Sequence, residues 1–208
     1  MGANLSELLA DLQEDQVIET VKERMAKGEP AIGIIDELQH GMELVGKRYQ
    51  AQEYYLSELI MSADIFKSAT GLLGDAFRAS NDKIGKIVLG TVFEDIHDIG
   101  KDIVAIVLSC NGIDVIDLGV NVPIERFVDA VREHQPDFVG LSCLLTTAYD
   151  NMKATVEALD AAGLHEGRKI LIGGGPVDET TRAYVKADAF CKNAQEAADM
   201  TKKMLGVN

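Results

Sequence analysis

The stretch that decides the fold reads Gly90-Thr91-Val92-Phe93-Glu94-Asp95-Ile96-His97-Asp98-Ile99-Gly100-Lys101. It begins within an apolar run, Lys86–Phe93, that predicts a short buried strand. A polar loop follows, in which Asp95 and His97 stand two residues apart, and the chain then enters an apolar run with helical spacing, Lys101–Asn111. The stretch therefore predicts a strand and a helix joined by a loop that carries ionisable side chains.

The same alternation continues to the end of the chain. Further strands are expected at Ile113–Leu118, Asp137–Ser142, Lys169–Ile172 and Ala187–Cys191. Further helices are expected at Ile124–His134, Ala148–Ala162, Glu179–Val185 and Ala194–Leu205. Five strands that alternate with helices predict an α/β, doubly wound, Rossmann-like parallel sheet with flavodoxin-type strand order and right-handed crossovers.

The first part of the chain has a different pattern. From about Asn4 to Ser80, apolar residues recur every three or four positions in four segments with short connections, which predicts a four-helix bundle. A polar stretch, residues 79–83, separates this part from the rest and is typical of a linker. We therefore expect two domains, a helical one at residues 1–82 and an α/β one at residues 83–208.

Composition excludes several classes of function. The hydrophobic content of 47% supports a core rather than disorder. The net charge is -14, and neither predicted domain is basic, so nucleic acid is not an expected partner. No apolar stretch reaches the roughly 20 residues of a membrane span. Three dispersed cysteines and an N-terminus without the features of a signal peptide lead us to expect a cytoplasmic protein.

Chemistry-bearing residues follow the predicted strands. In doubly wound sheets, ligands bind outside the carboxyl ends of the strands. Asp95 and His97 follow the first strand, Gly119 the second, Ser142–Thr147 the third, and Gly173–Pro176 the fourth. These positions predict a large crevice that holds one side chain able to reach a metal.

The Asp-x-His loop alone leaves alternatives open. The loop is compatible with a histidine that simply lies at the surface. A zinc site needs three or four protein ligands, and besides His97 only Cys143 is expected at the same edge of the sheet. Neither a dinucleotide fingerprint nor a P-loop is present. A phospho-acceptor receiver domain does not need Gly173-Gly174-Gly175 or a helical bundle. A metal that brings its own equatorial ligands needs only one axial donor from the protein.

The motifs resemble a known family, the cobalamin-binding domains. Its three-part signature is matched by Asp95-x-His97-x-x-Gly100, Ser142-x-Leu144 and Gly173-Gly174. The run from Asp95 to Lys101 is especially similar to corrinoid proteins of methyltransferase systems and to the cobalamin module of methionine synthase. Residues 41–46 and 53–59 resemble the helical cap that precedes that domain, so the resemblance covers nearly the whole chain.

The resemblance implies a cofactor and a role for each matching residue. Cobalamin or a related corrinoid is expected in the base-off/His-on form, with His97 as the lower axial ligand of cobalt and Asp95 hydrogen-bonded to it. These two are the expected catalytic pair, and Tyr55 is expected to cover the upper face. The cofactor and its nucleotide tail are expected to contact the strand-end residues Asp98, Ile99, Gly100, Gly119, Ser142, Leu144, Thr146, Thr147, Gly173 and Gly174.

Several positions depart from the pattern of that family, among them Phe190, Cys191 and Asn193 near the last predicted strand. Ala148 replaces the hydroxyl residue that extends the Asp–His relay in methionine synthase, so whether the relay continues beyond Asp95, for example through Thr146 or Thr147, stays open. Glu94 stands where glycine is common before the aspartate.

The function implied by the resemblance is that of a methyl carrier rather than a complete enzyme. Cobalt is expected to accept a methyl group from a substrate-specific methyltransferase. A second methyltransferase is expected to pass it to tetrahydrofolate or coenzyme M, and a reductive activase to maintain the cofactor. The methyl donor, among methanol, methylamines, betaines and methoxylated aromatics, is not encoded in this chain. A cobalamin-dependent sensor module and a mutase subunit are the alternatives.

Overall fold

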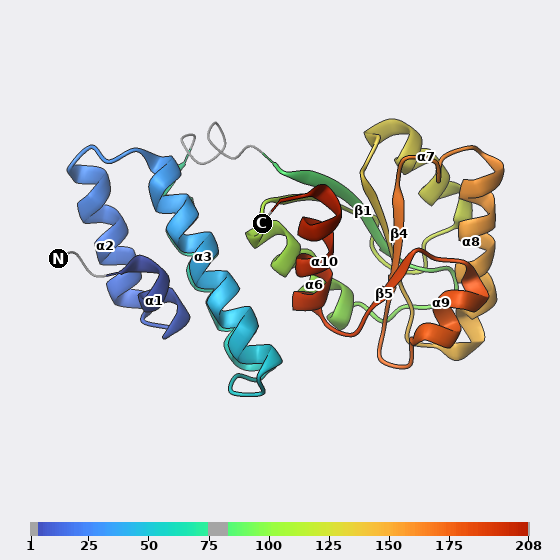
Figure 1. The fold of residues 1–208 in the computed structure, drawn as a ribbon, viewed down its shortest axis with the longest axis horizontal. Coiled ribbons are helices and arrows are strands. Elements are labelled where there is room, and N and C mark those ends of the chain that lie inside the picture. The colour runs from blue at the N-terminus through green and yellow to red at the C-terminus, as the bar shows by residue number, and fades with distance from the viewer. Residues whose placement is uncertain (1–3, 75–82, 208) are drawn as a thin grey trace. The chain divides into compact units, whose positions relative to one another are not determined.

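The structure, a computed structural model, describes residues 4–74 and 83–207. The chain divides into two compact units, one of helices and one built around a sheet (Figure 1). The predicted linker at residues 79–83 lies outside the described residues apart from Lys83, and so does Asp82 at the predicted domain boundary. That boundary therefore stays a prediction.

Within residues 4–74 the chain forms the four predicted helices: α1 Leu5–Ala10, α2 Glu14–Ala26, α3 Ala31–Gln50 and α4 Leu56–Leu73. Helices α1 and α3 cross closely, because a Cβ added at Gly41 would meet the Ser6 carbonyl oxygen at 3.0 Å. The Ser6 hydroxyl donates to the Glu37 carbonyl oxygen at 2.8 Å across the same crossing. The buried side chains of this unit include Leu5, Leu9, Leu38, Met42, Val45 and Phe66.

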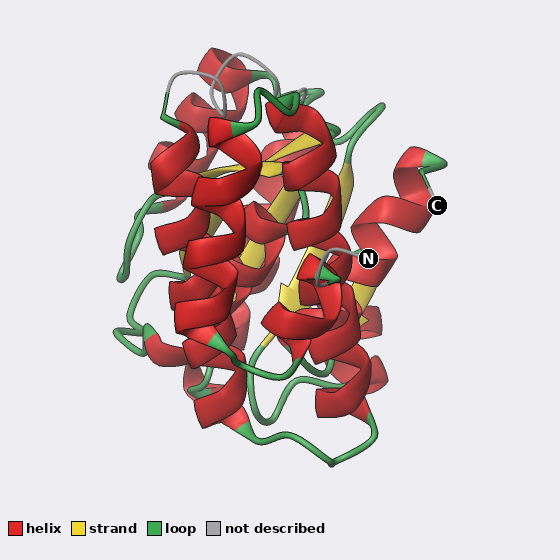
Figure 2. Ribbon diagram, turned by 90° about the vertical axis from the view of Figure 1, so that its left-hand side faces the viewer, coloured by secondary structure: helices red, strands yellow, loops and turns green. Residues whose placement is uncertain are grey.

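All the strands that the structure describes, coloured yellow in Figure 2, belong to the second unit. They are β1 Gly85–Thr91, β2 Ile113–Asp117, β3 Phe138–Ser142, β4 Lys169–Gly173 and β5 Ala189–Cys191. Every neighbouring pair is parallel, and the order is β2-β1-β3-β4-β5. The predicted doubly wound sheet with flavodoxin-type order is therefore confirmed.

Helices cover both faces of this sheet. They are α6 Ile99–Cys110, α7 Ile124–His134, α8 Tyr149–Ala161, α9 Glu179–Val185 and α10 Ala194–Leu205. Helices α6 and α10 lie on one face, whereas α7, α8 and α9 lie on the other (Figure 1). The latter face holds a continuous apolar core, in which Val88, Val139 and Ile170 of the strands meet Phe127 of α7 and Met152 of α8.

The structure corrects the bounds of several predicted elements. Strand β1 ends at Thr91 rather than Phe93, because Val92 pairs only through an isolated bridge with Val122. Residues Thr146–Ala148 form a 3-10 turn, η1, so α8 begins at Tyr149 rather than Ala148. Strand β5 begins two residues later than predicted, and α6 begins at Ile99 rather than Lys101.

Candidate functional site: an aspartate–histidine pair at the sheet edge

The loop that follows β1, residues 92–98 and here called the His97 loop, is attached to both neighbouring strand ends. The Val92 N–H donates to the Ser142 carbonyl oxygen at 3.1 Å, beyond the end of β3. On the other side, the Thr91 N–H donates to the Gly119 carbonyl oxygen at 2.9 Å, and the Asn121 N–H donates to that of Asp95 at 2.8 Å. The loop therefore lies at the carboxyl edge of the sheet, where a ligand site was predicted.

Asp95 is the buried centre of the site, with none of its surface exposed. Its Oδ1 accepts the His97 main-chain N–H at 3.0 Å and lies 2.7 Å from Nδ1 of the His97 ring. Its Oδ2 accepts the main-chain N–H groups of Leu144 and Leu145 at 2.6 and 3.0 Å. The carboxylate thus joins the His97 loop to the loop after β3, although about 50 residues separate the two in sequence.

The charge of Asp95 follows from these contacts. Burial alone raises the pKa of a carboxyl, but the hydrogen bonds from Leu145 N–H, from the His97 ring and N–H, and from Leu144 N–H outweigh it. They hold the pKa of Asp95 well below its usual range. An ionised carboxylate only accepts hydrogen bonds, so Nδ1 of His97 donates to it, and in the neutral form of the ring Nε2 then carries the free lone pair.

His97 presents that lone pair outward. Its side chain is 47% exposed, and within the described parts of the chain its Nε2 has no hydrogen-bond partner. The Thr91 hydroxyl donates to the His97 carbonyl oxygen at 2.9 Å, which closes the loop on the end of its own strand. A neutral imidazole whose other nitrogen is held by a carboxylate is a common form of protein metal ligand.

The strand register places two of the predicted contact residues, Ser142 and Gly173, at the sheet edge in line with the end of β1. Thr91 pairs with Ser142, and Ser142 pairs with Gly173, so these residues form one row across the sheet edge. The rim around them exposes large apolar side chains, which are Phe93, Ile96, Ile99, Val120, Leu144 and Leu145. Tyr55 is 71% exposed at the start of α4 and belongs to the helical unit, so its predicted place over the cofactor stays a prediction.

The glycines of the site differ in what they allow. Gly174 has φ +139°, and a Cβ there would lie 1.8 Å from the Cys143 carbonyl oxygen, so the two loops pass backbone against backbone. The close approach alone therefore requires glycine at this position. A Cβ at Gly100 would meet nothing within 4 Å among the described residues, which leaves the start of α6 open to a ligand.

Three residues with polar contacts at this edge of the sheet escaped the sequence reasoning. Asn121 and Asn151 bind the His97 loop through their side chains. Lys101, 3% exposed, lies at the start of α6, and its ammonium group binds Asp102 and Asp117. Lys101 could have been noticed from the sequence, because it belongs to the run Asp95–Lys101 that resembles the family. The two asparagines could not, because their contacts are with residues far away in the sequence.

The structure gives little support to a protein-built zinc site. Within the described residues, no group of three or more His, Cys, Asp or Glu side chains is placed to hold a metal ion. The Cys143 thiol donates to the Leu145 carbonyl oxygen at 3.2 Å, and burial raises its pKa to about 12. The site thus offers one imidazole nitrogen, which fits a metal that arrives with its other ligands attached.

The fold and the site together define a class of protein. It is a doubly wound domain that presents one imidazole, held by a carboxylate, at the edge where the strands end. The sequence profile of the B12 binding domain matches residues 85–201, and a second profile with the same description matches residues 2–73. The chain therefore belongs to the B12-binding family, as its motifs predicted.

Relatives narrow this family further. A dimethylamine corrinoid protein from Methanosarcina barkeri is 34% identical over 97% of this chain and 95% of its own length. The crystal structure of a cobalamin-binding protein from Desulfitobacterium hafniense has a TM-score of 0.82 and 38% identity, with 96% of both chains covered. That of the methanol:cobalamin methyltransferase complex MtaBC from Methanosarcina barkeri has a TM-score of 0.82 at 25% identity, covering 99% of this chain and 79% of the other.

The names of these relatives are thus those of a dimethylamine corrinoid protein, a cobalamin-binding protein and a methanol:cobalamin methyltransferase complex. One further finding concerns membranes: among the helices of the described residues, none combines the length and the apolar character that a membrane span requires.

Proposed function

We propose that this protein carries a methyl group on a bound corrinoid, with His97 as the lower axial ligand in the base-off/His-on form. The observation that carries the proposal is the His97 ring itself. Its Nδ1 is held at 2.7 Å by a buried, ionised Asp95, while its Nε2 is unpartnered among the described residues and faces out at the sheet edge. The names of the relatives support a corrinoid as the group that Nε2 meets.

When bound, the corrinoid supplies a cobalt centre that takes up and gives away a methyl group. The protein supplies orientation and basicity. Asp95 fixes the tautomer of His97 and strengthens its Nε2 as a donor, as carboxylates behind ligating histidines do. The exposed apolar rim that includes Ile96, Ile99 and Leu144 offers a surface that excludes water from a bound macrocycle.

The remaining predicted residues receive roles in the same proposal. The nucleotide tail lies against the strand-end segments that carry Gly119, Ser142, Thr146, Thr147 and Gly173. Gly100 leaves the entrance of that slot open, and Asp98 and Ile99 lie at its rim. Tyr55 of the helical unit shields the upper face of the corrinoid, so that unit acts as a cap.

The proton relay ends at Asp95 in this proposal. Ala148 is buried in the core and carries no hydroxyl. Oδ2 of Asp95 instead accepts hydrogen bonds from the main-chain N–H groups of Leu144 and Leu145, which do not release protons at neutral pH. Asp95 therefore acts as a fixed anion behind the imidazole.

The partners follow from the role of a carrier. A substrate-specific methyltransferase supplies the methyl group, and a second one delivers it to tetrahydrofolate or coenzyme M. A reductive activase restores the cofactor. The names of the relatives, which include methylamine and methanol systems, support methyltransferase partners.

Loading with methylcobalamin tests the proposal. The full chain, mixed with the cofactor and freed of excess by gel filtration, is expected to retain about one corrinoid per chain with the visible spectrum of an imidazole-ligated form. Absence of retained corrinoid would refute the proposal. The loaded protein should then methylate coenzyme M or tetrahydrofolate in the presence of a purified methyltransferase encoded beside it. Retention without transfer to either acceptor would instead indicate a sensor module.

A further inference from the structure

The residue before Asp95 adopts an unusual backbone conformation. Glu94 has φ +68°, in the left-handed region that residues with a Cβ occupy only with strain and that glycine occupies freely. This conformation turns the chain between Phe93 and Asp95. A loop that must present Asp95 inward therefore needs something to hold Glu94 in place.

Two asparagines from different elements hold this turn. The Oδ1 of Asn121, in the loop between β2 and α7, accepts the Glu94 N–H at 2.8 Å. The Nδ2 of Asn151, on α8, donates to the Phe93 carbonyl oxygen and to the Glu94 carboxylate, both at 3.0 Å. We call Asn121 and Asn151 the Glu94 clamp.

The clamp is directly connected to the ligating pair. The Asn121 N–H also donates to the Asp95 carbonyl oxygen at 2.8 Å, so one residue holds the main chain on both sides of the peptide bond between Glu94 and Asp95. If Glu94 relaxed to a negative φ, this peptide would rotate. The Asp95 carboxylate would then move away from the Leu144 N–H, and the His97 ring would lose its support.

We propose that Asn121 and Asn151 are positioning residues for the His97 imidazole, needed because this chain carries Glu94 where a glycine would adopt the turn unaided. The inference rests on the proposed function, since it concerns the same ligand. The clamp sets how much of the bound corrinoid is ligated by His97. It contributes little to the core, because Asn121 is exposed and Asn151 is only half-buried.

The first test compares Asn121→Ala with Asn121→Asp in the full chain loaded with cobalamin. Because Asn121 itself has φ +51°, Asn121→Gly, which removes the acceptor without Cβ strain at that position, is measured beside them and is expected to match the alanine variant. Aspartate keeps an acceptor for the Glu94 N–H, whereas alanine removes it. The ratio of His97-ligated to unligated corrinoid, read from the visible spectrum, is expected to fall about fivefold in the alanine variant, the size of one hydrogen bond. It is expected to stay near the wild-type value in the aspartate variant. Equal ratios in the alanine and aspartate variants would overturn the clamp.

The second test asks whether the clamp acts through Glu94. In a Glu94→Gly background the turn carries no Cβ strain, so Asn121→Ala is expected to change the ligated ratio by about twofold or less, close to the lower limit for one hydrogen bond. A fivefold loss in that background as well would show that the role of Asn121 does not depend on Glu94 and would overturn the inference. Asn151→Ala is expected to follow the same pattern.

One reference variant separates this inference from the proposed function. If the wild type and His97→Ala have identical spectra, His97 is not the ligand, and both proposals fail. If those two spectra differ while Asn121→Ala matches the wild type, the clamp alone fails. Circular dichroism and the melting temperature, expected to stay within a few degrees of the wild type, show that each variant is folded.

Discussion

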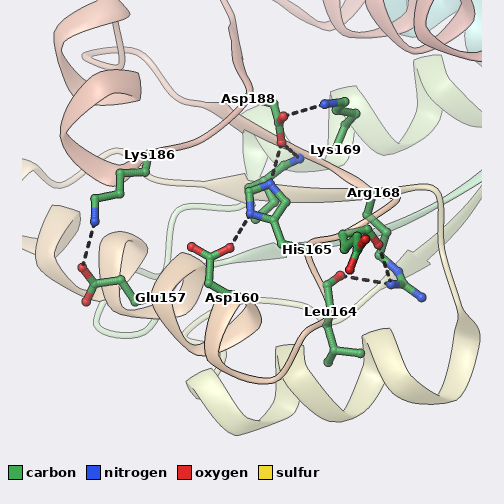
Figure 3. Close-up of polar contacts among 10 residues, drawn as sticks. Glu157, Asp160, Leu164, His165, Arg168, Lys169, Lys186 and Asp188 are labelled. Carbon is green, nitrogen blue, oxygen red and sulfur yellow. Dashed lines mark hydrogen bonds and ion pairs between the residues drawn. The ribbon is translucent and has the colours of Figure 1, made fainter.

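Two histidines at opposite edges of the same sheet show what makes an imidazole available to a ligand. His97 lies at the carboxyl ends of the strands and uses one ring nitrogen, Nδ1, on Asp95. His165 lies before β4, at the amino ends, and both its nitrogens are occupied (Figure 3). Its Nδ1 contacts Asp160, and its Nε2 lies 2.8 Å from Asp188.

The difference between them lies in what else each aspartate binds. Asp188 also accepts the Ile170 N–H at 2.8 Å and the Lys169 ammonium at 2.9 Å, so it ties strand β4 to the start of β5 (Figure 3). Asp95 likewise gathers main-chain N–H groups from two loops. Both carboxylates connect segments of chain, but only at the carboxyl edge does the imidazole keep a nitrogen free. An Asp–His pair alone therefore does not identify a site, and the second ring nitrogen decides.

The largest expected effect is on ligation of the corrinoid. His97→Ala should abolish the imidazole-ligated spectrum, because it removes the imidazole that is proposed to bind cobalt. His165→Ala should leave that spectrum unchanged, because its ring is fully engaged at the other edge. Visible spectroscopy of both loaded variants measures this. An altered spectrum in His165→Ala would break the distinction between the two histidines.

The next effect concerns the packing of the loops at each edge. Gly174→Ala should destabilise the fold by roughly 2–4 kcal/mol, because the new Cβ overlaps the Cys143 carbonyl oxygen at a strained φ. Gly167 also has a positive φ, +78°, but is open to solvent, so Gly167→Ala should cost only about 1 kcal/mol. Urea unfolding of the two variants gives both values, and equal losses would contradict the close crossing at Gly174.

Exchange of the two aspartates for their amides should separate their roles. Asp95→Asn should weaken corrinoid binding by roughly 10- to 100-fold, as do other changes behind a ligating histidine. The amide group also carries N–H donors of its own, which would face the N–H donors that bind the carboxylate in the wild type. Asp188→Asn should lower stability but leave the affinity for the corrinoid as in the wild type. Equilibrium binding of cobalamin, followed by absorbance, measures this. Equal affinity in Asp95→Asn and wild type would remove Asp95 from the proposed role.

The smallest expected effect depends on pH. Burial alone lowers the pKa of His165, but its hydrogen bonds with Asp188 and Asp160 outweigh burial and raise it. A histidine with a raised pKa stabilises the fold fully below its unfolded value of about 6.5, and this contribution is lost as the pH rises through the folded pKa. The free energy of unfolding of the wild type should therefore exceed that of His165→Gln by about 1–2 kcal/mol at pH 6.

The difference in free energy of unfolding between the wild type and His165→Gln should shrink toward alkaline pH. Urea unfolding at several pH values between 6 and 9 measures it for both proteins. A difference that grows with pH would contradict the ion-paired state of His165. Corrinoid binding by His165→Gln should stay at the wild-type level throughout, because the two edges are separate.

Local patterns predicted most of the fold. The bounds of α7, α9 and α10 are those expected from apolar spacing, and the parallel sheet followed from the alternation of strands and helices. Errors arose where a backbone conformation interrupted a pattern. Strand β1 ends early because Glu94 turns into the left-handed region, which its side chain gives no reason to expect. The 3-10 turn before α8 was missed because Thr146 and Thr147 also suit the start of a helix.

The sequence indicated candidate site residues but not the contacts that hold them in place. The motif and its family resemblance indicated His97 and Asp95. They did not indicate the N–H groups of Leu144 and Leu145, because any residue type provides a main-chain donor. The contacts of Asn121 and Asn151 span 27 and 57 residues or more, beyond the reach of any local pattern. Both kinds of contact depend on how the strand ends meet in space.

The hydrogen bond from the Thr91 hydroxyl to the His97 carbonyl oxygen also has a thermodynamic consequence. It closes the loop through a contact within the protein itself, so the conformational entropy of that segment, about 1–2 kcal/mol per residue, is lost when the protein folds. A ligand that meets the imidazole encounters a preorganised donor, and its affinity is not reduced by ordering of the loop. Thr91→Val would move that entropy loss from folding to binding, where calorimetry would detect it.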